Sequence, residues 1–334
     1  MKKITINDVA KTAQVSKTTV SHYLNERYKN MSPDTRERIS LAINDLNYNP
    51  NVIAKSLKNK KTMTIGIIVA NILHSFSTQV IRAIEDYAHG ENYHVIVCNA
   101  DNDPVKEKDY IQMLLAKQVD GLVIIPTSDN DELFSKLVAD DYPVVFVDRF
   151  IEGISIPSFL LDNENAIQTA FNHLLDKGYE EIGFVSQPIE DISARIERQN
   201  AYMDLCFRHK MEPFTTSGGL ALIHQSLDEA IKKDALPKSL IVANDLALFE
   251  VLKLVKKHGL NIPEDLSLIS IDDIEFAEFF NPGITVVAQP SFSIGEQAAQ
   301  TLFEIINKKE YEIKIHRFKP ELIERDSVIE YESK

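Results

Sequence analysis

The sequence predicts an all-α helix-turn-helix headpiece followed by a larger α/β body with two parallel, doubly wound sheets. Two observations lead to this prediction. Near the N-terminus, two short helical patterns of apolar residues each follow a capping residue. From residue 63 onward, short apolar runs alternate with amphipathic helical stretches, which is typical of βαβ units.

The first two helices are predicted from capping residues and apolar spacing. Thr5 and Asp8 have the spacing of a capping pair, so a helix should begin at Ile6. Apolar residues at i, i+3, i+4 and i+7 from Ile6 form one helical face. Ser16 can cap a second short helix in which Val20 points inward. Two short helices joined by a tight turn form a helix-turn-helix, whose second helix can enter the major groove of DNA.

The outward face of the second helix is polar, with Lys17, Thr18, Ser21 and His22 able to form hydrogen bonds. An ordinary helical pair within a larger core is the alternative, because spacing alone does not separate the two. Charge favours the DNA-binding interpretation. Residues 1–62 contain 12 Lys and Arg and 5 Asp and Glu, a balance of +7, whereas the whole chain carries −14. A basic region fused to an acidic body is typical of a DNA-binding module joined to another domain.

The stretch from Val9 to Asn25 resembles the headpiece of the LacI/GalR family of bacterial transcription regulators. The shared pattern is V-A-x-x-A-x-V-S-x-x-T-V-S-x-x-L-N. The chain departs from many members at Gln14, where they have glycine, and at His22, where they have arginine, the best bidentate reader of guanine. The resemblance implies a homodimer that binds a double-stranded DNA operator and responds to a small effector. In the headpiece, we expect DNA contacts from Thr5, Ser16, Lys17, Thr18, Thr19, Ser21, His22 and Asn25.

A third helix is predicted from about Pro33 to Leu46, since Ser32 can cap it and proline fits its first turn. It would complete a headpiece over residues 1–48. Residues 49–62 follow as a hinge helix and linker. This helix, of about eight residues, is too short to be stable alone in water.

The hinge helix resembles the one that, in the family, folds on the operator in the minor groove. By that resemblance Leu57 is a wedge inserted at the central base step. The alternative is a flexible linker whose leucine packs on the body. The expected hinge contacts are Asn51, Ala54, Lys55, Leu57 and Lys58.

The body, residues 63–334, alternates predicted strands and helices in two series. The first has strands near 63–69, 93–98, 120–125 and 143–147, with helices near 77–90, 104–117 and 130–140. The second has helices near 164–177, 196–209, 223–233 and 245–258, with strands near 181–186, 239–243, 267–271 and 284–287. The resemblance implies a periplasmic-binding-protein-like body, with lobe 1 at about 63–161 and 291–320 and lobe 2 at about 162–290 and 321–334.

Polar residues follow several predicted strands, where open parallel sheets bind their ligands. Carboxylate and amide acceptors, arginine donors and an aromatic wall together suit a polyol. The resemblance selects Phe76, Ser77, Asp148, Arg198, Asn244 and Asp272, and we add Ser193 and Arg195 from the loop and helix start after strand 181–186. The chain has His74-Ser75-Phe76-Ser77 where the family usually has Asn-Pro-Phe-Phe, and Ser270-Ile271 where it usually has Gly-Phe. Taken singly, Asp148 and Asp245 could be helix caps, and Arg195 could be a solvated helix residue.

Arg195 and Arg198 could together hold an anionic group, because arginine binds carboxylates through paired hydrogen bonds. The stretch from Gln187 to Tyr202 and the D-N-D-P run from Asp101 to Pro104 resemble the ketodeoxygluconate-operon repressors within the family. We therefore hypothesise that the effector is a sugar acid. A neutral sugar is the alternative.

Other function classes find little support in the sequence. It contains no G-x-G-x-x-G after a strand, no Walker loop, no G-x-S-x-G and no H-E-x-x-H, so we expect neither an enzyme nor a cofactor. Two cysteines and scattered histidines give no metal-ligand spacing. With no signal peptide and no long apolar run, we expect a cytoplasmic protein without a membrane partner. A sugar-binding transport receptor on the same body fold is the runner-up interpretation, and the basic headpiece counts against it.

Overall fold

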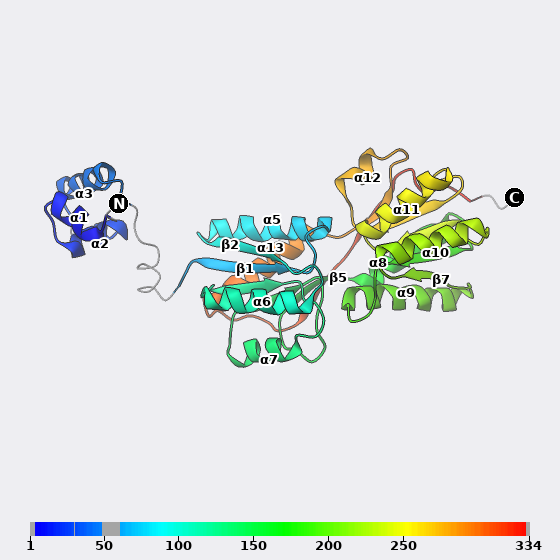
Figure 1. The fold of residues 1–334 in the computed structure, drawn as a ribbon, viewed down its shortest axis with the longest axis horizontal. Helices are drawn as coiled ribbons and strands as arrows, with labels where there is room; N and C mark the ends of the chain where they lie inside the picture. Colours follow the sequence, from blue (N-terminus) through cyan, green and yellow to red (C-terminus); the bar gives the residue numbers. More distant parts are fainter. Residues whose placement is uncertain (1–3, 30, 49–60, 332–334) are drawn as a thin grey trace. The chain divides into compact units, whose positions relative to one another are not determined.

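The computed structural model describes residues 4–29, 31–48 and 61–331, and it divides into two compact units, Met1–Thr62 and Met63–Lys334 (Figure 1). The predicted hinge contacts Asn51, Ala54, Lys55, Leu57 and Lys58 lie outside the described residues.

The N-terminal unit contains three helices: α1 (Ile6–Thr12), α2 (Lys17–Leu24) and α3 (Pro33–Asp45). Each begins where the sequence supplies a cap. The backbone N–H of Thr5 donates to the Asp8 carboxylate at 2.8 Å, which is half of a capping box. Ser16 Oγ accepts from the backbone N–H of Thr19 at 3.0 Å, and Ser32 begins α3 in the same way.

Apolar side chains from all three helices form the core of this unit. Val9 of α1, Val20 of α2 and Ile39 of α3 are fully buried. The turn between α1 and α2 places Gln14 at φ 56°, in the left-handed region that favours glycine. The sharp turn is therefore made without glycine, at some conformational cost.

Lobe 1 of the body is a six-stranded, wholly parallel sheet in the order β11-β5-β4-β3-β1-β2. Its strands are β1 (Thr64–Val69), β2 (His94–Asn99), β3 (Gly121–Ile124), β4 (Val144–Val147), β5 (Ser158–Leu161) and β11 (Ile315–Phe318). Helices α5 (Ser75–Gly90) and α13 (Ser291–Ile306) pack on one face, and α6 (Pro104–Ala116) and α7 (Asp131–Ala139) pack on the other.

Close packing of α13 against α5 depends on Gly295. A Cβ atom at this position would lie 2.8 Å from the Cβ of Ala83 and 2.9 Å from the backbone oxygen of Val80. A side chain there would force the two helices apart, so glycine allows α13 to return to lobe 1 and cover its sheet.

Lobe 2 is a six-stranded sheet in the order β12-β10-β9-β8-β6-β7. Its strands are β6 (Ile182–Ser186), β7 (Phe214–Ser217), β8 (Ser239–Val242), β9 (Ser267–Ile271), β10 (Thr285–Ala288) and β12 (Glu321–Ile323). All pairs are parallel except β12 with β10. Helices α8 (Asn163–Asp176) and α9 (Ser193–His209) cover one face, and α10 (Leu220–Lys232) and α11 (Asp245–His258) cover the other, with the short α12 (Glu275–Phe279) beside them.

The chain passes between the lobes three times: after β5, after β10 and after β11. The architecture confirms the predicted fold class, a helical headpiece with a two-lobed body of parallel-dominated sheets. The exception is the antiparallel edge strand β12, which arises because the chain re-enters lobe 2 directly, without a crossover helix. The short strands β5, β7, β11 and β12 and helix α12 have no counterpart among the elements predicted from the sequence, whereas the sequence predicts a helix near 293–307 that corresponds to α13.

Candidate functional site

Helix α2 presents a polar face that is the first candidate site. Lys17, Thr18 and His22 are exposed, and Ser21 is half-buried. Positions i, i+1, i+4 and i+5 share one side of a helix. The four side chains predicted to read bases therefore lie together on the second helix of the pair.

Other predicted DNA contacts also hold the headpiece together. Thr5 caps α1, and the Ser16 hydroxyl bonds to both the backbone N–H and the hydroxyl of Thr19. Asn25 Nδ2 donates to the backbone oxygen of Ser21 at 2.6 Å at the end of α2. These side chains therefore have a structural partner within the unit.

A second candidate site lies between the lobes, beyond the carboxyl ends of strands from both sheets. Asn71 and Asp148 come after β1 and β4 in lobe 1, and Asn244 and Asp272 come after β8 and β9 in lobe 2. All four line one pocket, with about 460 Å³ of space that no atom fills, including its opening to solvent. Facing sheet edges bring the strand ends of the two lobes together.

The pocket wall contains seven of the eight effector-binding residues predicted from the sequence: Phe76, Ser77, Asp148, Arg195, Arg198, Asn244 and Asp272. Ser193 is not among the residues that line this pocket, so its contact with the effector stays a prediction. Its hydroxyl accepts a hydrogen bond from the backbone N–H of Phe150 at 3.0 Å. Phe150 follows β4 and Ser193 begins α9, so this bond joins the two lobes.

Four further polar residues line the pocket without having been selected from the sequence: Asn71, His74, Arg149 and Gln289. Asn71, Arg149 and Gln289 each lie within two residues of a strand's carboxyl end. The sequence identifies Asn71 and Arg149 as polar strand-end residues, although neither is among the effector contacts selected from it, whereas Gln289 is located only by the structure. His74 does not follow a strand directly, and the feature that marks it in the sequence is its departure from the asparagine that the family usually has at this position.

Arg195 lies in the pocket with neutral hydrogen-bond acceptors. It donates to the backbone oxygen of Pro188 at 2.7 Å and to Oε1 of Gln187 at 3.1 Å. Burial and the positive charge of Arg149 lower the pKa of Arg195 to about 9, and Arg198 acts in the same direction. Arg195 is buried, so it is not the solvated helix residue of the alternative interpretation.

Arg149 adds a third buried cation from lobe 1. It donates to the backbone oxygen of Pro126 at 3.1 Å and to Asn102 Oδ1 at 3.2 Å, and its Nε lies 3.4 Å from Asp148 Oδ2. Burial lowers the pKa of Arg149, while the negative charges of Asp148 and Glu107 work to raise it. A ligand anion would relieve the repulsion among the three buried guanidinium groups.

Asp272 supplies a carboxylate hydrogen-bond acceptor whose pKa is raised. Burial and the negative charge of Asp245 raise the pKa of Asp272 to about 6, although Arg198 and a hydrogen bond from Gln289 act in the opposite direction. Asp272 and Asp148 have φ values of 83° and 66°, in the left-handed region. Strained backbone of this kind is common at ligand sites, where the surrounding fold holds it in place.

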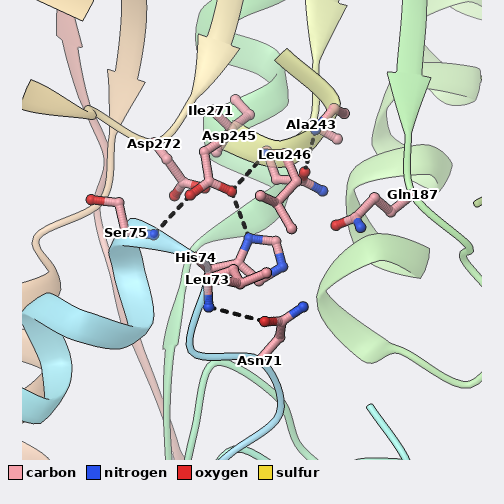
Figure 2. Close-up of polar contacts among 12 residues, drawn as sticks. Asn71, Leu73, His74, Ser75, Gln187, Ala243, Asp245, Leu246, Ile271 and Asp272 are labelled. Atoms are coloured by element: carbon pink, nitrogen blue, oxygen red, sulfur yellow. Dashed lines mark hydrogen bonds and ion pairs between the residues drawn. The ribbon is translucent and has the colours of Figure 1, made fainter. Parts of the chain in front are cut away.

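Figure 2 shows how the lobes meet beside this pocket. His74, which precedes α5, places its ring Nδ1 2.5 Å from Oδ1 of Asp245, the first residue of α11. The backbone N–H of Ser75 donates to the other Asp245 oxygen at 2.7 Å. Asn244 caps α11, so the Asp245 side chain is available to lobe 1. Asp245 is therefore not the N-cap, although its carboxylate also accepts from the N–H of Leu246.

Asp272 and Asp273 point in different directions, as their adjacent positions predict. Asp272 accepts from Gln289, whereas Asp273 Oδ1 lies 2.9 Å from Arg325 Nη2. Within residues 4–29, 31–48 and 61–331, no group of three His, Cys, Asp or Glu side chains is placed to hold a metal ion. No helix among these residues is long and apolar enough to cross a membrane.

Two family models match the chain. Residues 5–51 match the bacterial regulatory proteins of the lacI family, and residues 171–328 match a periplasmic binding protein-like domain. A protein of Paenibacillus polymyxa named "Probable HTH-type transcriptional regulator EndR" is 42% identical over 334 residues, covering 97% of this chain and 98% of its own. The chain belongs to the lacI family of bacterial transcriptional regulators.

This lacI-family regulator is also similar to the HTH-type transcriptional regulator KdgR of Bacillus subtilis, with 31% identity over 90% of the chain and 91% of the relative. The lac repressor dimer bound to operator and the anti-inducer ONPF has the same fold, with a TM-score of 0.88 and 24% sequence identity. The match covers 98% of this chain and 100% of that chain. A LacI transcriptional regulator from Alkaliphilus metalliredigens complexed with D-xylulofuranose has a TM-score of 0.72 over 80% of this chain and 99% of its own, with 28% identity.

Proposed function

We propose that this regulator is a homodimeric repressor of a carbohydrate-utilisation operon and that its effector is a sugar acid bound between the lobes. The observation that carries the effector assignment is the group of three buried arginines in the pocket wall. Arg195 and Arg198 donate to neutral acceptors, and Arg149 has one carboxylate beside it. Buried cations favour an anionic partner, and guanidinium groups bind carboxylates through paired hydrogen bonds.

The remaining wall suits the hydroxyl groups of the same ligand. Asp148, Asp272 and the Asn244 side chain are acceptors for hydroxyl donors, and Phe76 supplies an apolar surface. A structural relative crystallised with D-xylulofuranose, and the resemblance to ketodeoxygluconate-operon repressors, support a carbohydrate ligand.

An apolar groove on lobe 2 supports the dimer. Its lining includes Phe249, Phe276 and Phe280 from α11, α12 and the residue after α12. Phe276 is 51% exposed, and neighbouring Phe279 is 77% exposed. Exposed aromatic clusters of this kind mark protein interfaces. The lac repressor structure with the same fold is a dimer, and we propose the same assembly for this chain.

The headpiece would read each half of a near-palindromic operator through Lys17, Thr18, Ser21 and His22, because a two-fold dimer requires two related half-sites. Following the family resemblance, we propose that the hinge helices order on the operator, with Leu57 inserted at its centre. Effector binding would change the angle between the lobes and disfavour hinge folding. Such coupling is reciprocal, so operator binding must also alter effector affinity.

Operator binding is tested by the shift of an operator fragment at several salt concentrations. We expect full-length protein to bind with an affinity that falls steeply as salt rises, because lysine and arginine release counterions from phosphates. Deleting residues 1–62 should abolish the shift. A body that still binds DNA specifically would place the interface elsewhere.

Effector class is tested by following the thermal midpoint of the full-length protein with sugars and sugar acids, including 2-keto-3-deoxygluconate. A ligand that binds the folded state raises the midpoint by mass action. We expect the largest shift from a sugar acid. Tighter binding of a neutral sugar than of any sugar acid, measured by calorimetry, would overturn the assignment.

A further inference from the structure

Arg198 in the pocket is connected to the opposite lobe through two side chains. Its Nε donates to Asn163 Oδ1 at 2.8 Å, and Asn163 Nδ2 donates to Glu197 Oε2 at 2.8 Å. Glu197 in turn receives two hydrogen bonds from Arg317, from Nη1 to Oε2 at 3.0 Å and from Nη2 to Oε1 at 2.5 Å. We call these four residues the arginine relay.

The donors and acceptors on either side of Asn163 allow only one orientation of its side-chain amide. An arginine can only donate and an ionised carboxylate can only accept, so the amide oxygen must face Arg198 and the amide nitrogen must face Glu197. Asn163 is 1% exposed. A buried amide that loses one of these partners has little water to replace it, so its orientation is strongly held.

The two ends of the relay belong to different lobes. Arg317 lies in β11 of the lobe 1 sheet, just before the chain crosses to lobe 2. Glu197 and Arg198 are consecutive residues of α9 in lobe 2. Asn163 is the first residue of α8, directly after another crossing of the chain. A change in the angle between the lobes must therefore move Arg317 relative to Glu197.

Arg198 has a second anchor that does not involve lobe 1. Its Nη1 donates to the backbone oxygen of Ala243 at 2.6 Å, at the end of β8. The direction of the guanidinium group is thus set by one acceptor fixed within lobe 2 and by Asn163, which is tied through Glu197 to lobe 1. Displacing Arg317 would disturb only the Asn163 side of this arrangement.

We propose that Asn163, Glu197 and Arg317 are positioning residues that aim Arg198 at the effector only when the lobes have the angle that forms the Glu197–Arg317 pair. The role of Arg198 as an effector contact rests on the proposed function. The relay itself rests on the hydrogen bonds above. Effector affinity and lobe angle are then linked through one arginine side chain.

A purely stabilising role for the ion pair predicts different behaviour. The Glu197 and Arg317 side chains are 22% and 37% exposed, and ion pairs open to water contribute little to folding stability. Breaking the pair should therefore change the thermal midpoint slightly and the effector affinity strongly. A structural bond alone would show the reverse.

The first test measures binding of 2-keto-3-deoxygluconate to the full-length protein by calorimetry. Asn163→Ala and Glu197→Ala should each raise the Kd about tenfold or more, the range for losing a hydrogen bond to a charged group. The double variant should be no weaker than either single variant, because both break the same relay. Asp204→Asn is the matched control: it removes an exposed ion pair with Arg208 on the same helix, and should leave the Kd unchanged. An unchanged Kd in Asn163→Ala or Glu197→Ala would overturn the proposal.

A charge exchange separates the relay from simple attraction between the lobes. Glu197→Arg combined with Arg317→Glu restores an ion pair across the lobes. The arginine introduced at position 197 can only donate, so Asn163 would turn its oxygen toward it and its nitrogen toward Arg198. Two donors would then face each other at Arg198, so the exchanged protein should not recover effector affinity although the charges across the lobes are restored. Recovery of affinity would show that attraction alone is sufficient, and would overturn the relay.

An effector-free measurement keeps this inference separate from the proposed function. Arg317→Gln, Arg198→Met and their combination are compared by thermal midpoint in the absence of ligand. If Arg317 and Arg198 are coupled, the decrease in thermal midpoint of the double variant should be smaller than the sum of the decreases in the two single variants. Additive decreases, or a decrease larger than the sum, would overturn the relay. If the unsubstituted protein binds no sugar acid, the effector assignment fails, and this cycle alone decides the relay.

Discussion

His74 of lobe 1 and Asp245 of lobe 2 lie in direct contact, with 2.5 Å between Nδ1 and Oδ1, and the Asp245 side chain is 1% exposed. Burial works to raise the pKa of Asp245, but the hydrogen bond and charge of His74, with the N–H groups of Ser75 and Leu246, outweigh it and hold this pKa below its ordinary value. The contact therefore stabilises the ionised acid and the observed arrangement of the lobes.

Removing this contact should destabilise the body. We expect His74→Ala to lower the free energy of unfolding by about 2 kcal/mol, because a buried carboxylate loses a charge-assisted hydrogen bond. Urea unfolding at pH 7 measures the change. His224→Ala is the matched control, since His224 is more exposed and contacts Glu250 within lobe 2 at 3.4 Å. Equal losses in the two variants would argue against a special role for the contact between the lobes.

Asp272→Asn should stabilise the protein at neutral pH. The pKa of Asp272 is raised to about 6, so its ionisation costs folding free energy above that pH and costs nothing below its unfolded pKa of about 4. We expect a gain of about 1–3 kcal/mol at pH 7 that disappears as the pH falls through 6 toward 4. Unfolding of both proteins across this pH range tests it, with circular dichroism as the readout.

Asp245→Asn is the control, because we expect it to change the free energy of unfolding at pH 7 in the opposite direction. Because the pKa of Asp245 is lowered, its carboxylate stabilises the fold above its unfolded pKa, and this contribution is lost as pH falls through the lower folded value. The variant should be less stable at pH 7, and the difference should narrow in acid. A pH-independent difference for both variants would mean that neither acid titrates on its own in this way.

Arg198→Ala should abolish the response to effector and leave operator binding nearly unchanged. The substituted side chain lies in the pocket and belongs to a different compact unit from the headpiece. Fluorescence anisotropy of a labelled operator, with and without sugar acid, measures both properties. Arg208→Ala, an exposed position on the same helix, serves as the control. A normal response in Arg198→Ala would remove this residue from the effector site.

Phe276→Asp should convert the proposed dimer into monomers, because Phe276 lines the apolar groove and is 51% exposed. A carboxylate at an exposed aromatic position of the apolar groove would have to be buried without a partner in the interface. Light scattering after size-exclusion chromatography gives the mass directly. Phe207→Asp is a demanding control, because Phe207 is 86% exposed on α9 and is not part of the groove lining. Dissociation by Phe207→Asp alone would move the interface to α9.

Val20→Ala should weaken the headpiece and spare the body. Val20 is fully buried between the three helices, so the shorter side chain leaves a cavity and costs about 1–3 kcal/mol in this small unit. Operator affinity should fall, while the thermal midpoint of the body and its effector binding stay unchanged. A matching loss of body stability would mean that the units do not unfold independently.

Local chemistry made much of this protein predictable from its sequence. The caps at Thr5, Ser16 and Ser32 depend on side chains three residues from their backbone partners, so sequence spacing alone locates those helices. The longer strands and helices of the body also carry their periodicity within one segment. The edge strands β7 and β11 have only four residues each and are partly exposed, so they carry no comparable apolar pattern.

The pocket between the lobes contains both residues that the sequence predicts and contacts that only the structure shows. Strand ends are local features, and they placed Asp148, Asn244 and Asp272 correctly at one sheet edge or the other. Which side chains meet across the cleft depends on how the two sheets face each other. His74 with Asp245, and Arg317 with Glu197, are separated by more than one hundred residues, and no periodic signal links such distant positions. The sequence by itself determined the family, the element order and the strand-end residues, because these depend on short-range spacing and on a local motif. Only the tertiary structure decided the partners between the lobes, because packing of the two sheets sets those distances.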